Sequence, residues 1–203
     1  MAKAITREEG KLITRRRLLE SAAKVLGETG YGALSVSAVT RAAGVAQPTF
    51  YVHFRDKDDL LRTLADEKLS GLRAKLREAR ARVRAGQGVD AVRDTFRLPL
   101  QTFLEQPALF QLYQQELHHP GSPIGEQSRR LRDDLRADLT EDLIGLGMLT
   151  ITDGDRGQVE MIAEAMIAQT EALGLGYLEG RYHDVEAIVE VLTRFAVGVL
   201  GLQ

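Results

Sequence analysis

The sequence predicts an all-α protein with about nine helices, arranged as an N-terminal three-helix head followed by a larger helical body. Three observations lead to this expectation. Apolar residues recur at three- and four-residue spacing through successive segments, which is the period of amphipathic helices. No segment shows the strict apolar–polar alternation of a half-buried strand. Glycine, proline, serine and aspartate stand at the ends of the periodic segments, where helices start and stop.

Residues 1–13 are predicted to form a flexible polar arm, and the first helix follows them and ends at Gly30. Aliphatic residues at helical spacing mark the inner face of this helix. They are Leu18, Leu19, Ala22, Ala23 and Leu26.

Two short helices joined by a tight turn are predicted next, between Leu34 and Phe54. Ser35 stands just before the first apolar-periodic residues, as a helix N-cap does. Gly44 ends the first short helix, because a residue without Cβ readily takes the left-handed conformation that turns the chain. Pro48 belongs to the first turn of the second, where its missing N–H costs nothing. This order is the helix-turn-helix arrangement, whose second helix enters the DNA major groove.

The second short helix sorts its side chains by face, since each residue turns by about 100°. Phe50 and Phe54 fall together, and we expect them to anchor the helix on the core. Gln47, Pro48 and Tyr51 share the opposite face. Glutamine pairs with adenine, and the apolar surfaces of proline and tyrosine can meet a thymine methyl group. This face is therefore the predicted base-reading face.

Polar side chains beside that face are candidates for the DNA backbone, because phosphate contacts position a protein on the duplex. The candidate DNA-binding residues are Ser35, Ser37, Gln47, Pro48, Thr49, Tyr51, His53 and Lys57. Two readings remain open for the basic residues of the first helix: backbone or minor-groove contacts, and a plain solvated helix start. These residues are Lys11, Arg15, Arg16 and Arg17.

Residues 44–60, GVAQPTFYVHFRDKDDL, resemble the signature of the TetR family of one-component bacterial repressors. The family pattern is G-V-S-x-x-T-[LFI]-Y-x-[HY]-F-x-[SN]-K-[ED]-x-L. Ala46 stands at the usual serine and removes a helix cap, at a cost of about 1 kcal/mol. Pro48 stands where glycine is common. The alternative reading, a short helix pair inside an all-α bundle, leaves Thr, Tyr, His and Lys at these offsets unexplained.

The resemblance implies a ligand-responsive transcriptional regulator, with repression as the family's default. It implies a homodimer whose last two helices pair with those of a second subunit as a four-helix bundle. It also implies a palindromic operator of double-stranded DNA and a small-molecule pocket enclosed by the intervening helices. We accordingly divide the chain into a DNA-binding domain at residues 1–57 and a ligand-binding and dimerisation domain at residues 58–203.

The body is predicted to contain six helices, the first a long charged helix from Lys57 to about Ala85. A helix over residues 89–104 is expected to be interrupted by Pro99, because an interior proline removes a backbone hydrogen bond. This break is either a local kink or the sign of a helix held away from its neighbours by a cavity. The remaining helices are expected over about 107–117, 123–145, 153–180 and 184–202.

The ends of the last three helices carry local signals. Ser122 with Pro123 is predicted to cap one helix, and Asp184 is predicted to cap the last. Thr152 with Asp155 has the spacing of a capping box.

The candidate pocket wall is drawn from apolar and amide side chains of the body, on both sides of Pro99. They are Phe96, Leu100, Phe103, Leu104, Phe110, Tyr113, Leu139, Leu143, Met166 and Gln169. For each one, packing in the core is the alternative. Ala165 is a further candidate, at which a phenylalanine is expected to fill the cavity.

The order of features after the head is similar to that of acyl-CoA-responsive repressors of fatty-acid genes. This similarity lies in the FRDKDDL junction, the arginine-rich helix after it and the FLEQPALFQLYQQE segment. It implies an apolar effector such as a long-chain acyl-CoA or a fatty acid. The alternative is a multidrug- or xenobiotic-sensing repressor of an efflux gene with the same fold. That class usually buries carboxylates and several aromatic residues, and the body has few aromatics.

The composition excludes several other classes. The chain has no cysteine, no phosphate-binding glycine loop and no recognisable catalytic grouping, so we expect neither an enzyme nor a cofactor. His118 and His119 lack further ligands at metal-binding spacing. The absence of a signal or membrane-spanning segment predicts a cytoplasmic protein. Residues 1–57 carry ten Lys/Arg and five Asp/Glu, whereas the rest carries seventeen and twenty-four, which favours a basic DNA-binding head on an acidic body.

Overall fold

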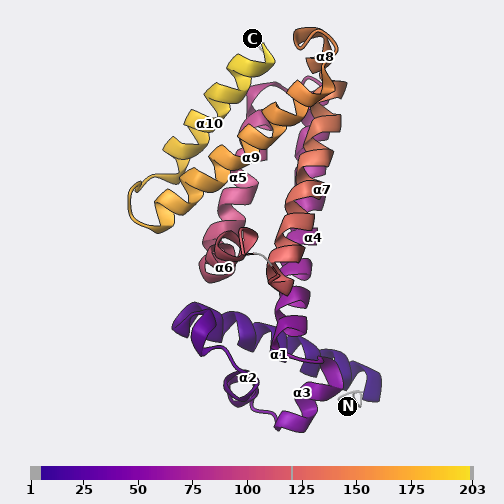
Figure 1. Cartoon of the computed structure of the whole chain (residues 1–203), viewed down its shortest axis with the longest axis vertical. Helices are drawn as coiled ribbons and strands as arrows, with labels where there is room; N and C mark the ends of the chain where they lie inside the picture. Colours follow the sequence, from indigo (N-terminus) through magenta and orange to yellow (C-terminus); the bar gives the residue numbers. More distant parts are fainter. Residues whose placement is uncertain (1–5, 120, 202–203) are drawn as a thin grey trace, which may run out of the picture. The chain divides into compact units, whose positions relative to one another are not determined.

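The computed structural model describes residues 6–119 and 121–201, and these residues form helices and short connections without any strand. Ten α-helices and one 3₁₀ turn follow one another in this part of the chain (Figure 1). They are α1 (Arg7–Thr29), η1 (Tyr31–Ala33), α2 (Val36–Ala43), α3 (Gln47–His53), α4 (Lys57–Arg84), α5 (Gly88–Glu105), α6 (Pro107–Leu117), α7 (Pro123–Gly145), α8 (Met148–Ile151), α9 (Arg156–Leu178) and α10 (Val185–Leu200). The all-α prediction is confirmed: the nine predicted helices are present, and the additional one is the single-turn α8.

The chain divides into two compact units. The first unit takes residues 1–68 and 106–127, and the second takes residues 69–105 and 128–203. Helices α4 and α7 each contribute residues to both units. The predicted division after Lys57 is a division by function and stays a prediction.

The first helix begins earlier than the sequence predicted. The Oγ1 of Thr6 accepts a hydrogen bond from the Glu9 N–H at 3.2 Å, and the Glu9 carboxylate accepts one from the Thr6 N–H at 2.7 Å. This reciprocal pair is a capping box, and it starts α1 at Arg7. Residues 7–13 of the predicted polar arm are therefore helical, and residues 1–5 lie outside the described residues.

The helix-turn-helix forms through the local signals that predicted it. The Ser35 Oγ accepts a hydrogen bond from the Ala38 N–H at 3.1 Å and caps α2. Gly44 ends α2 with φ of 64° and ψ of 36°, the left-handed conformation expected there. Ala46 occupies the N-cap of α3 without a side-chain hydrogen bond, and Pro48 lies in the first turn.

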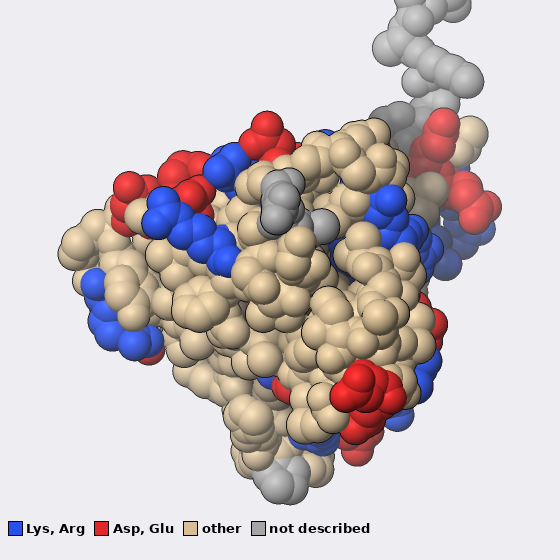
Figure 2. Space-filling view, turned by 90° about the horizontal axis from the view of Figure 1, so that it is seen from above, with Lys and Arg blue, Asp and Glu red and all other residues tan. Residues whose placement is uncertain are grey.

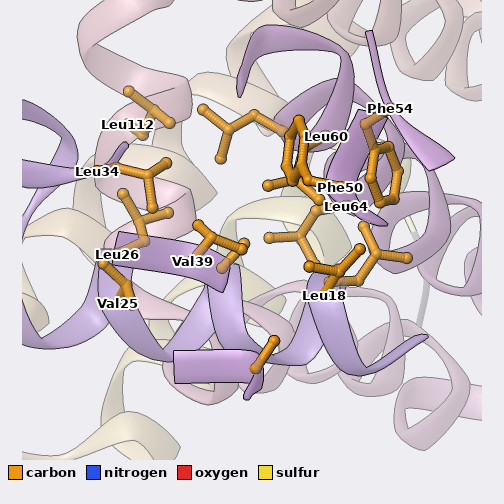
Figure 3. Packing of buried hydrophobic residues seen from close by; sticks show 14 of the residues in the cluster. Leu18, Val25, Leu26, Leu34, Val39, Phe50, Phe54, Leu60, Leu64 and Leu112 are labelled. Carbon is orange, nitrogen blue, oxygen red and sulfur yellow. The ribbon is translucent and has the colours of Figure 1, made fainter. Parts of the chain in front are cut away.

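The core of the first unit joins residues that are far apart in the sequence. Leu18 of α1, Val39 of α2, Phe50 of α3 and Leu60 of α4 are all fully buried in one cluster. Figure 3 shows Leu112 of α6 in the same cluster, beside Leu34 and Leu26. Helix α6 therefore completes the core of the unit that carries the helix-turn-helix.

The second unit has two apolar clusters. One joins α5 to α10, through residues such as Phe96 and Leu192, and the other surrounds Leu143 where α7, α8 and α9 meet. Helices α9 and α10 lie side by side (Figure 1). Gly174 of α9 lies against α5, since a Cβ there would be 3.2 Å from Leu100 and 3.1 Å from Phe103. The loss of helix propensity at this glycine is thus compensated by close helix packing.

Ion pairs join α4 to α7 within the second unit. The Arg73 Nε lies 2.5 Å from Asp138, and this hydrogen bond raises the pKa of Arg73. The Arg80 Nε lies 2.6 Å from the Asp142 carboxylate, which also pairs with Arg84. Arg80 is buried, and burial lowers the pKa of its guanidinium to about 10. Arg80 still carries its charge at neutral pH, and the carboxylates of Asp142 and Asp138 stabilise this buried charge.

Two sequence predictions about the body are wrong. Helix α5 continues through Pro99, although a break was expected there. Pro99 is buried, and tertiary packing supports the helix where one backbone hydrogen bond is missing. Thr152 does not cap α9: its hydroxyl donates to the Met148 carbonyl, and Asp155 is the N-cap, accepting hydrogen bonds from two backbone N–H groups.

On the face seen in Figure 2, acidic and basic side chains lie next to one another towards the margin, and a broad uncharged area lies between them. Among the described residues, every helix is too short or too polar to span a lipid bilayer.

Replacing Asp142 by asparagine is expected to lower the free energy of unfolding by about 3 kcal/mol, because it removes the carboxylate that is paired with the buried Arg80. Asp134→Asn is the matched control: Asp134 also pairs with an arginine of α4, but its side chain is 58% exposed, against 13% for Asp142. The control is expected to cost less than about 1 kcal/mol. Urea unfolding of the two variants measures the difference, and equal losses would contradict the assigned role of the buried pair.

Candidate nucleic-acid interface

Helix α3 is held by two buried aromatic rings on one side. Phe50 is fully buried, Phe54 is 2% exposed, and their ring centroids lie 5.6 Å apart. A helix of seven residues is not stable by itself in water. Burial of the two rings therefore stabilises α3 and determines which of its faces points to solvent.

The opposite face of α3 is open to solvent, as predicted. Gln47 and Pro48 are exposed, Tyr51 is 60% exposed and Val52 is 64% exposed. The Tyr51 ring stands edge-on to the Phe50 ring at 5.4 Å between centroids. The Phe50 ring is thus in the core while the neighbouring Tyr51 ring is largely exposed, which suits contact with base edges.

The polar candidates beside α3 differ in how they are held. Ser35 caps α2, Ser37 is exposed in the first turn of α2, and Thr49 is half-buried. His53 is half-buried at the end of α3. Burial, followed by the positive charges of Lys11 and Arg15, holds the pKa of His53 below its ordinary value of 6.5. A phosphate beside the imidazole would act in the opposite direction and favour its protonation.

Lys57 is half-buried at the start of α4, with its ammonium 4.3 Å above the centroid of the Tyr31 ring. Burial, and then the negative charges of Asp58 and Glu116, raise the pKa of Tyr31, so its hydroxyl stays protonated. The ring provides a cation–π contact that orients the lysine without neutralising it.

The basic residues of α1 do not form one uniform surface. Arg15 turns inward and donates to the His53 carbonyl oxygen at 2.9 Å, and Arg16 pairs with Glu20 at 3.0 Å. Lys11 and Arg17 are exposed. Neither of the two readings left open for Arg15, a DNA contact or a solvated helix start, anticipated this internal contact. The sequence gives no signal for it, because the contact spans 38 residues.

The pocket candidates lie in both compact units. Phe110 and Tyr113 belong to the first unit, where their rings stack at 6.3 Å. Within the second unit, Met166 packs against both apolar clusters and Gln169 is half-buried. Phe96, Leu100 and Phe103 belong to the α5–α10 cluster or pack against it, Leu139 and Leu143 do the same for the other cluster, and Leu104 is half-buried.

Two further sequence expectations concern this part of the molecule. Ala165 is exposed on α9, one helical turn from the exposed Met161, so it does not face the interior as the pocket hypothesis required. Within residues 6–119 and 121–201, no group of three or more His, Asp or Glu side chains is placed to hold a metal ion.

Residues 18–64 match the family described as bacterial regulatory proteins of the tetR family. This segment runs from the middle of α1 into α4 and contains the whole helix-turn-helix. The match covers α3 together with both of its aromatic anchors.

Solved structures with the same fold include regulators from several bacteria. A protein described as a TetR-family transcriptional regulator, from Syntrophomonas wolfei, superposes with a TM-score of 0.74 at 19% identity, over 95% of this chain and 97% of that one. The fatty acid degradation regulator FadR from Bacillus halodurans gives 0.72 at 18% identity, over 93% and 95%. A protein described as a fatty acid metabolism regulator, from Clostridium perfringens, gives 0.62 at 17% identity, over 91% and 97%. At these identities the likeness concerns the fold.

Gln47→Ala and Lys57→Ala are expected to weaken DNA binding in different ways. If Gln47 contacts a base edge, its loss removes about 1–3 kcal/mol of discrimination between the correct and a wrong base at one position, and it leaves the salt dependence of binding unchanged. The loss of a phosphate-binding lysine weakens binding equally on all sequences and reduces the slope of log K against log salt by about 0.9 per subunit. Fluorescent duplexes are first selected from a random pool with the wild-type protein. Titrating each variant against these duplexes, at several salt concentrations, measures the base discrimination and the salt slope. A changed salt slope for Gln47→Ala, or a changed base preference for Lys57→Ala, would contradict these roles.

Proposed function

Since residues 18–64 carry the DNA-binding segment of the tetR family and the chain has the fold of TetR-type regulators, we propose that it is a homodimeric, effector-responsive regulator of transcription that binds a palindromic operator. The observation that carries the proposal is α3, whose aromatic anchors are buried while Gln47, Pro48 and Tyr51 are exposed. Regulators of this type are not enzymes, and their chemistry is confined to binding.

An exposed apolar stripe supports the homodimer. Val191, Phe195 and Val199 recur at four-residue spacing on α10 and are 45%, 59% and 42% exposed. Met161 of the neighbouring α9 is 65% exposed. Single exposed apolar residues are ordinary, but an apolar row along one helix indicates an interface. A second copy of the same row, related by a two-fold axis, would cover it. Two recognition helices would then read half-sites about 34–36 Å apart.

For the effector, we propose an apolar molecule such as a long-chain acyl-CoA or a fatty acid, with control of lipid genes. Two regulators of fatty acid metabolism share this fold, which supports the proposal at the level of architecture. The body also has apolar side chains on α5, α7 and α9, including Leu100, Leu143 and Met166, that could line a site for an acyl chain.

A charged interior pair argues against the multidrug-sensing alternative. Glu171 of α9 is buried, but it is paired with Arg132 of α7, whose side chain is 16% exposed. Binding of an aromatic cation draws on an unneutralised carboxylate in an apolar site. Glu171 does not offer one while Arg132 holds it.

Phe195→Glu is expected to separate the subunits, because it places a charge in the centre of the apolar stripe. The loss of such a buried aromatic contact weakens association by more than about thirtyfold. Ile151→Glu is the matched control, since Ile151 is 58% exposed, close to the 59% of Phe195, but lies outside α9 and α10. Sedimentation velocity at micromolar concentration decides the matter. A Phe195→Glu protein that remains dimeric would disprove this interface.

Long-chain acyl-CoA is expected to raise the melting temperature of the protein. At a hundredfold excess over Kd a ligand stabilises by about 2.7 kcal/mol, which corresponds to roughly 5–10 °C for a chain of this size. Hexadecanoyl-CoA, hexadecanoate, free CoA and a cationic dye are compared in one thermal-shift series. Stabilisation by the dye alone would favour the multidrug reading, and stabilisation by free CoA would remove the role of the acyl chain.

Met166→Phe tests whether the effector lies among the interior side chains of the body. If Met166 lines the site, the larger ring fills it, so the acyl-CoA response disappears while operator binding and the ligand-free melting temperature are kept. In a filled core the same change overpacks, typically costing 1–3 kcal/mol. A lowered melting temperature with an intact acyl-CoA response would therefore place Met166 in the core.

A further inference from the structure

We propose that Arg15 is a positioning residue, which sets the end of the recognition helix α3 in its base-reading orientation and does not itself bind a phosphate. The proposal rests on the DNA-binding function proposed above. Arg15 lies on α1 and contacts α3 and α4 within the first unit, whereas the sequence had left open a DNA contact or a solvated helix start.

The guanidinium of Arg15 meets three partners that lie on two other helices or at their ends. Its Nη1 donates to the main-chain carbonyl of His53, the last residue of α3, at 2.9 Å. Its central carbon lies 4.4 Å from the centroid of the Phe54 ring. Its Nη2 lies 3.5 Å from the Thr63 hydroxyl on α4, at the limit of a hydrogen bond. One side chain of α1 thus contacts the end of α3 and the inner face of α4.

The end of α3 has a chemical need for such a partner. The last carbonyl groups of a helix have no N–H of their own helix to accept from. They also carry the partial negative charge of the helix terminus, which favours a cation. Arginine suits this position better than lysine, because its planar group can stack on a ring while its edge donates hydrogen bonds.

The position of this contact makes it relevant to sequence reading. His53 follows Tyr51, a residue of the predicted base-reading face, by two positions, and both belong to the last turn of α3. Because α3 has only seven residues, a displacement of its C-terminal end displaces the whole helix. A shift of its end moves Tyr51 and His53 directly, and base contacts depend on hydrogen-bond geometry.

Arg15 differs from the neighbouring basic residues of α1 in its burial and in the direction of its donors. Arg15 is half-buried and its donors face inward, whereas Lys11 and Arg17 are exposed. Both Lys11 and Arg15 lie close enough to His53 for their charges to lower its pKa. Lys11 therefore remains a candidate for binding a phosphate next to His53, whereas Arg15 holds His53 in position.

Arg15→Gln and Arg15→Lys test the assignment in the full-length protein. A duplex selected from a random pool by the wild type is compared with a scrambled duplex, across a series of salt concentrations. For both variants we expect the ratio of specific to non-specific affinity to fall by at least about tenfold, as one misplaced bidentate base contact would. The salt slope is expected to stay at the wild-type value, because no phosphate contact is lost.

A phosphate-binding role gives the reverse pattern and would overturn the proposal. In that case Arg15→Gln lowers the slope by about 0.9 per subunit at an unchanged specificity ratio, and Arg15→Lys behaves like the wild type. Far-UV circular dichroism confirms that the variants are folded at the assay temperature, and Arg15→Lys serves if the glutamine variant is not. Arg17→Gln is the matched control and should keep its specificity ratio.

The two proposals fail in different ways. If the wild-type protein selects no sequence from the pool, the proposed function is wrong. If it selects one and both Arg15 variants discriminate as well as the wild type, only the positioning role is wrong.

Discussion

The burial of Phe50 and Phe54 is the contact on which the surface of the first unit depends. These rings remove roughly 150–250 Å² each from water, a driving force that a seven-residue helix cannot obtain from its own backbone. Because the rings are one helical turn apart, they fix the rotation of α3 about its axis as well as its location. The exposure of Gln47, Pro48 and Tyr51 is a geometric consequence of where the rings are buried.

Local chemistry explains why the helix-turn-helix could be predicted from the sequence. A serine cap, a left-handed glycine and an early proline act over three or four residues, so their effects are visible in a short stretch. Ser35, Gly44 and Pro48 all have the predicted roles. The separation of α3 into a buried and an exposed face followed from helical periodicity alone.

Other features depend on contacts between distant segments, and these could not be read from the sequence. The Arg15 contact with His53 and the Arg80 pair with Asp142 each join separate helices. Pro99 was expected to break a helix, but the packing around it outweighed its local preference. Ala165 was expected to lie beside a cavity, but it is exposed on α9, which also exposes the apolar Met161. Periodicity alone does not tell which face of such a helix is covered by the same chain.

The contribution of α6 to the core of the first unit has a consequence for how this protein is made. Leu112 and Ile124 are buried in the same cluster as Leu18 and Phe50, although about fifty residues or more separate them from the helix-turn-helix. A nascent chain that ends before α6 therefore lacks part of the wall of its N-terminal unit. The core of that unit is complete only after residues 106–127 have left the ribosome, when α5 has already emerged. For the same reason, a hybrid regulator built by exchanging heads would need to carry α6 along with α1–α4.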